Sequence, residues 1–102
     1  MVLDARNDVY FSAASIWEIA IKSGLRRKDF KADCHRVVEA LIRNGFVELP
    51  ITAAHAARVA ELPVIHRDPF DRMLVAQSVA EPMTLLTLDA LLGRYGAMVK
   101  VV

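Results

Sequence analysis

Short apolar segments alternate with longer amphipathic segments along this 102-residue chain, and no other feature restricts its fold as strongly. We expect strands at 9–11, 46–49, 83–86 and 98–101, and helices at 15–23, 33–43, 52–62, from 69 onward and at 89–94. Strands that alternate with helices predict an α/β fold with a mostly parallel sheet and helices on its faces. Ligands bind such sheets outside the carboxyl ends of the strands.

The size and composition of the chain limit the classes of protein to which it can belong. One small domain is expected at this length, and 55% hydrophobic residues suffice for a packed core. The formal net charge of +1 excludes a strongly basic nucleic-acid binder, so any nucleic-acid site must be a local patch. A single cysteine, Cys34, excludes an intramolecular disulfide and a cysteine-based zinc site. Without a membrane-spanning run or a signal-peptide pattern, a cytoplasmic protein is expected.

Four acidic residues are expected where a helix begins, namely Glu18, Asp68, Asp71 and Asp89. In a parallel α/β sheet these helix starts gather along one edge. Carboxylates within about 5 Å of each other repel by about 3 kcal/mol per pair at an effective dielectric constant of 20, so a cluster favours a bound cation. Oxygen ligands suit Mg²⁺ or Mn²⁺, and such an ion orients a phosphodiester and activates water for attack.

Each of these acids also has a structural explanation. Ser15 and Glu18 have the spacing of a capping box. Asp68 precedes a proline as an N-cap does, and Asp71 then complements the helix dipole. Asp89 is placed to cap the last helix. An α/β domain in which all the acids cap helices therefore remains an alternative.

A basic segment follows the helix that carries Glu18; its residues are Lys22, Arg26, Arg27, Lys28 and Lys31. By itself such a run is most often a solvated loop. Beside an acidic metal site it can instead bind the phosphates of a nucleic acid. Arg67 and Arg72, which flank the segment with Asp68 and Asp71, can bind the same phosphates.

The histidines and the thiol give weaker signals. His35 and His55 fall on amphipathic helices, where we expect them at the surface or at an edge. His66 is expected to orient the loop before Asp68. Cys34 has only His35 beside it, and neighbours in a helix point in different directions, so no thiol nucleophile is indicated. The four scattered glycines argue against a phosphate-binding loop.

Three segments resemble the PIN-domain family, and more closely its VapC-type toxins from bacterial toxin–antitoxin pairs. Residues 9–22 are similar to a strand and helix whose acid matches Glu18. Residues 66–77 carry the next acid at Asp71, and residues 85–89 end at the last acid, Asp89. The resemblance extends over essentially all of the chain from Val9 onward.

The resemblance implies a PIN-like three-layer α/β sandwich formed by residues 1–102 as one domain. It implies a Mg²⁺- or Mn²⁺-dependent endoribonuclease with Glu18, Asp71 and Asp89 as catalytic metal ligands. The RNA-binding residues would be Lys22, Arg26, Arg27, Lys28, Arg67 and Arg72. A VapB-type antitoxin would hold the enzyme inactive, and family members commonly form dimers.

The N-terminal segment departs from the family pattern. Family members begin with an apolar strand that ends in an Asp, followed by helices, before the segment that starts here at Val9. Only residues 5–8 separate Asp4 from that segment, whereas a parallel crossover needs a dozen or more residues. We therefore expect residues 2–5 to be the end of a helix and the chain to be an N-terminally truncated member, with Asp4 as the less favoured candidate for the missing acid.

Loss of a central strand has two expected consequences. Uncovered strand edges and apolar faces predict a homodimer or a domain-swapped oligomer. A site that lacks one acid is also consistent with an alternative function. In that alternative the chain is a catalytically inactive fragment that binds only the antitoxin or RNA.

Overall fold

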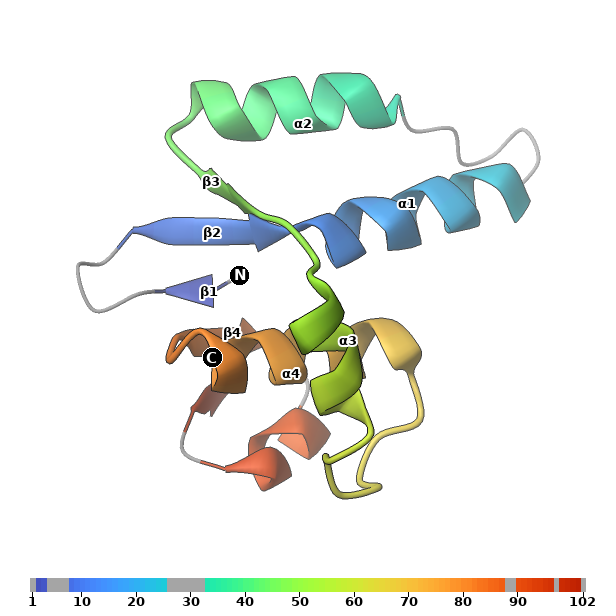
Figure 1. The fold of residues 1–102 in the computed structure, drawn as a ribbon. Coiled ribbons are helices and arrows are strands. Elements are labelled where there is room, and N and C mark those ends of the chain that lie inside the picture. Colours follow the sequence, from blue (N-terminus) through green and yellow to red (C-terminus); the bar gives the residue numbers. More distant parts are fainter. Residues whose placement is uncertain (1, 4–7, 26–32, 88–89, 97, 102) are drawn as a thin grey trace.

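The computed structural model describes residues 2–3, 8–25, 33–87, 90–96 and 98–101, which form a sheet with helices packed against it (Figure 1). Its elements are β1 (Val2–Leu3), β2 (Val9–Ser12), α1 (Ala13–Leu25), α2 (Cys34–Arg43), β3 (Val47–Leu49), α3 (Ala53–Val59), α4 (Pro69–Ala80), β4 (Thr84–Thr87), the 3₁₀ helix η1 (Ala90–Tyr95) and β5 (Val99–Val101). The expected α/β fold is confirmed. In the described part of the chain, no helix is long and apolar enough to cross a membrane.

The five strands lie in the order β3-β2-β1-β4-β5. β2 pairs with β3 in parallel, and so does β4 with β5. Between these pairs lies β1, which is antiparallel to both β2 and β4. The four strands other than β1 therefore run in the same direction, and the carboxyl ends of β2 and β4 lie at the same edge of the sheet.

The position of β1 corrects the expectation that residues 2–5 end a helix. Val2 and Leu3 form a strand that pairs with the first halves of β2 and β4. The connection 4–8 is too short for a parallel crossover, so the chain returns as an antiparallel hairpin. β1 consequently runs toward the edge where β2 and β4 begin. Asp4, the alternative acid, lies outside the described residues.

The start of α1 corrects a second expectation. The helix begins at Ala13, directly after β2, because the Ser12 hydroxyl accepts a hydrogen bond from the backbone N–H of Ala14 at 3.0 Å. Ser15 and Glu18 therefore both lie inside the helix, and the capping box expected between them does not form. The structural explanation that the sequence offered for Glu18 is thus removed.

Three helices begin at the N-caps expected from the sequence. Asp33 accepts hydrogen bonds from two backbone N–H groups at the start of α2, and Thr52 accepts one at the start of α3. The Asp68 carboxylate does the same for α4, with Pro69 as the first helical residue. α3 ends at Val59, earlier than the expected limit at residue 62.

Helix α4 lies at the centre of the molecule, where it packs against α1, α3, β4 and η1. Its middle residues, 75–78, are buried on every side of the helix. Val75 joins Leu85 of β4, Leu92 of η1 and Val99 of β5 in the hydrophobic core. This burial fixes the first turn of α4 relative to the sheet.

A buried polar network joins the end of β2 to α3 and α4. The Ser12 hydroxyl donates to Gln77 Oε1 at 2.5 Å, and Gln77 Nε2 lies 3.4 Å from His55 Nδ1. His55 Nε2 lies 2.7 Å from Glu81 Oε2. The expectation that His55 lies at the surface or at an edge is therefore wrong, because the residue is 1% exposed. Burial is tolerated because both ring nitrogens have partners.

We expect Gln77→Leu to lower the free energy of unfolding by about 2 kcal/mol, because the buried Ser12 hydroxyl and Pro50 carbonyl lose their partner. Urea unfolding followed by circular dichroism measures this loss. The control is Glu61→Gln in an exposed ion pair, where a change within about 0.5 kcal/mol is expected. Equal unfolding midpoints for the two variants would show that the network adds no stability.

Candidate functional site

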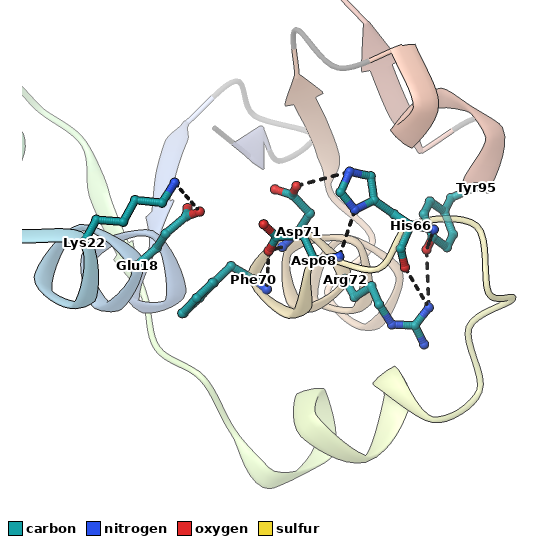
Figure 2. Close-up of polar contacts among 8 residues, drawn as sticks. All are labelled: Glu18, Lys22, His66, Asp68, Phe70, Asp71, Arg72 and Tyr95. Atoms are coloured by element: carbon teal, nitrogen blue, oxygen red, sulfur yellow. Dashed lines mark hydrogen bonds and ion pairs between the residues drawn. The ribbon is translucent and has the colours of Figure 1, made fainter. Parts of the chain in front are cut away.

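An aromatic contact brings two of the predicted acids onto neighbouring helix turns. The rings of Trp17 in α1 and Phe70 in α4 meet edge to face, with centroids 5.1 Å apart. Glu18 and Asp71 each follow one of these aromatic residues. In Figure 2 the two carboxylates project on the same side of the helix pair. The contact thus holds together the helix turns of α1 and α4 that carry these two acids.

Glu18 is a partly exposed carboxylate that forms an ion pair with Lys22. Its Oε2 lies 3.1 Å from Lys22 Nζ, one helical turn along α1, and its side chain is 25% exposed. An exposed pair of this kind contributes little to stability, so Lys22 can move away at small cost. The pair therefore does not lock either side chain in place.

The two acids at the start of α4 have different surroundings. Asp68 Oδ1 accepts hydrogen bonds from the backbone N–H groups of Phe70 at 2.8 Å and Asp71 at 3.2 Å. The structural explanation therefore holds for Asp68. The Asp71 side chain is 27% exposed, and its Oδ2 lies 3.5 Å from His66 Nε2. The partly exposed Asp71 carboxylate therefore lies beside the His66 imidazole.

Arg72, predicted as an RNA contact, is bound within the protein. Its guanidinium donates to the carbonyl oxygens of Val59 at 3.0 Å and Pro63 at 3.2 Å. It also lies 3.4 Å from the Tyr95 hydroxyl. These bonds hold the segment that leads into α4. Arg67, by contrast, has an exposed side chain.

Several predicted site residues lie outside the described residues; they are Asp89, Arg26, Arg27 and Lys28. β4 ends at Thr87, at the same edge of the sheet where α1 begins. Within the described ranges, no group of three or more His, Cys, Asp and Glu side chains is arranged to hold a metal ion. The described part of the site therefore consists of the Glu18 and Asp71 carboxylates with His66 beside them.

The chemistry of these groups fits a hard divalent cation. Both available ligands are carboxylates, and carboxylate oxygens suit Mg²⁺ and Mn²⁺ better than softer metals. His66 Nδ1 already accepts a hydrogen bond from the backbone N–H of Asp68, so it is not presented as a nitrogen ligand. Cys34 lies at the start of α2, on another element.

Two of the cavities in the described part of the chain are largely apolar and are lined by residues of α1. One of about 170 Å³ extends between α1 and α2, where Ile19 and Leu41 line it. The other, of about 280 Å³, reaches from Trp17 to Val38 and Glu48. Neither of these two cavities is lined by Glu18 or Asp71.

Comparison with known proteins gives one family. Residues 2–97 match the family model described as PIN domain. No curated protein and no solved structure matches the chain. The matched range contains Glu18, Asp71 and Asp89, the three acids that the sequence predicted as ligands.

Proposed function

This chain belongs to the PIN-domain family, and from that premise we propose that it cuts RNA phosphodiesters as a Mg²⁺-dependent endoribonuclease of the VapC type. The family indicates a nuclease-type function, and PIN domains generally depend on divalent metal ions. The observation that supports the proposal most is the Trp17–Phe70 contact, since it sets Glu18 and Asp71 on adjoining helix turns.

The residues that would hold Mg²⁺ or Mn²⁺ are Glu18, Asp71 and Asp89. When bound, the ion supplies a Lewis acid that orients the phosphodiester and lowers the pKa of a water molecule. Glu18 would bind the ion after the Lys22 ammonium group has moved away from its carboxylate. The His66 ring would remain in contact with Asp71. The acidic site is partly exposed, which allows an RNA backbone to reach it.

RNA would be held mainly through its phosphates. The proposed contacts are Lys22, Arg26, Arg27, Lys28 and Arg67, and such contacts position the backbone without reading its sequence. Arg72 has a different task in this proposal, because its hydrogen bonds hold the segment before α4 in place.

Apolar side chains on the surface support a protein partner. Trp17, Ile42 and Val47 are exposed large hydrophobic residues on α1, α2 and β3. Exposed apolar groups favour association, so we propose a VapB-type antitoxin and a homodimer or domain-swapped oligomer as partners of this chain.

One observation favours a second candidate function, a catalytically inactive PIN protein that binds only antitoxin or RNA. The resemblance implies a first strand that runs to the site and ends in an acid. β1 instead runs toward the edge where β2 and β4 begin. If no acid is supplied at that position, the metal site is incomplete.

The two candidate functions are separated by an RNA cleavage assay. Structured RNA is incubated with the full chain and Mg²⁺, with EDTA, and with EDTA followed by excess Mg²⁺. The proposed enzyme cleaves in the first and third mixtures only. RNA that is bound but uncut in every mixture supports the inactive alternative. RNA that is neither bound nor cut contradicts the proposed enzyme and restricts the inactive alternative to a protein that binds only an antitoxin.

We expect Lys22→Ala to weaken RNA binding and to reduce the slope of log affinity against log salt concentration by about one, because one phosphate contact is lost. Fluorescence anisotropy at several salt concentrations measures both quantities. Lys100→Ala is the matched control, since Lys100 is an exposed lysine on β5. Equal slopes for the two variants would exclude Lys22 from the RNA site.

A further inference from the structure

The imidazole ring of His66 is held in place by its own loop. Its Nδ1 accepts a hydrogen bond from the backbone N–H of Asp68 at 3.0 Å. The backbone N–H of His66 donates to the Tyr95 hydroxyl at 2.9 Å, and the Arg72 guanidinium lies 3.5 Å from its carbonyl oxygen. With 16% of its side chain exposed, the ring has little freedom to turn.

These contacts define which ring nitrogen carries the proton. A backbone N–H can only donate, so Nδ1 must be the acceptor, and the neutral ring is protonated on Nε2. Nε2 lies 3.5 Å from Asp71 Oδ2 and points toward that carboxylate (Figure 2). The loop therefore presents one N–H donor to Asp71.

We propose that His66 is a positioning residue, which orients the Asp71 carboxylate through its Nε2–H so that Asp71 and Glu18 face the same cation. Carboxylate ligands of metals are commonly oriented by a hydrogen-bond donor placed beside them. The inference rests on the proposed function, because it requires that Asp71 binds a metal. It adds a role for His66 beyond the orientation of its own loop.

Two substitutions separate the positioning role from the loop role. His66→Asn keeps an acceptor oxygen near the place of Nδ1, so it can still bind the Asp68 N–H, but its short side chain does not reach Asp71. His66→Gln places an amide N–H near the position of Nε2. Thermal unfolding of both variants shows whether the loop and the fold are retained.

The first readout is the tautomer of His66 in the metal-free protein. A long-range ¹H–¹⁵N correlation spectrum is expected to show His66 protonated on Nε2 and unprotonated on Nδ1. The second readout is the dissociation constant for Mg²⁺ by calorimetry. We expect His66→Asn to raise it about tenfold or more, and His66→Gln to raise it less than His66→Asn does.

The outcomes distinguish this inference from the function on which it rests. If the wild-type chain binds no Mg²⁺, the proposed function fails and the inference fails with it. If the wild-type chain binds Mg²⁺ and folded His66→Asn binds it equally tightly, the inference alone is overturned. A His66 ring protonated on Nδ1 also overturns it alone.

Discussion

Asp71→Asn is expected to reduce Mg²⁺-dependent RNA cleavage by at least about 100-fold, which corresponds to about 3 kcal/mol of transition-state stabilisation. The substitution keeps the shape of the side chain but replaces a charged ligand with a neutral amide. The fold should survive, because the cap of α4 is formed by Asp68 and not by Asp71. Loss of the charge near the helix N-terminus costs at most about 2 kcal/mol at a partly buried position such as this one.

The matched control is Asp68→Asn in the same turn of α4. Asparagine is as good an N-cap as aspartate, so this variant should retain both the fold and the cleavage rate. Full activity in Asp71→Asn would mean that cleavage comes from a contaminant or another site. An equal loss in Asp68→Asn would mean that activity depends on the helix start and not on the Asp71 carboxylate.

Leu85→Ala is expected to lower the free energy of unfolding by about 2–5 kcal/mol, because a cavity replaces a fully buried side chain. Leu85 is 1% exposed, and it packs in the core with Val75, Leu92 and Val99. It also lies in β4, between β1 and β5. A domain of this size has about 5–15 kcal/mol of stability in total, so the variant should be partly unfolded at mild urea concentrations.

The control for this prediction is Val64→Ala, which shortens a side chain that is 86% exposed. Its free energy of unfolding should change by less than about 0.5 kcal/mol. Urea unfolding followed by tryptophan fluorescence and by circular dichroism measures both variants. A loss below about 1 kcal/mol in Leu85→Ala would show that β4 is not part of the stable core.

Most features set by neighbouring residues could be predicted from the sequence, although the start of α1 at Ala13 was not. Asp33, Thr52 and Asp68 are confirmed as N-caps, since a cap binds backbone groups only two or three residues away. The strands at β3, β4 and β5 were expected within a residue or two of their observed bounds, because β-prone apolar residues form them.

Features set by distant residues could not be predicted in the same way. β1 is a strand because Val2 pairs with Leu85, a residue far along the chain. His55 is buried because Gln77 of α4 and Glu81, which follows that helix, lie against its two ring nitrogens in addition to the backbone N–H of Thr52. A histidine on an amphipathic helix gives no local signal of such partners.

The candidate site shows the same limit. Resemblance to the family identified Glu18 and Asp71, but nothing in the sequence showed that Trp17 and Phe70 bring their helices together. The one available signal was that an aromatic residue precedes each acid. The sequence likewise predicted a loop role for His66 but not its approach to Asp71.

The central claim is that Glu18 and Asp71 belong to one cation site at the edge of the sheet where β2 and β4 end. Substoichiometric Mn²⁺ tests it directly, because a bound Mn²⁺ ion broadens the backbone amide signals nearest to it. We expect broadening around Glu18 and Asp71, sharp signals from the turns at 44–46 and 81–83 at the opposite edge, and no broadening in Asp71→Asn. Broadening that is absent from the wild-type chain, or that centres on other residues, would contradict the claim.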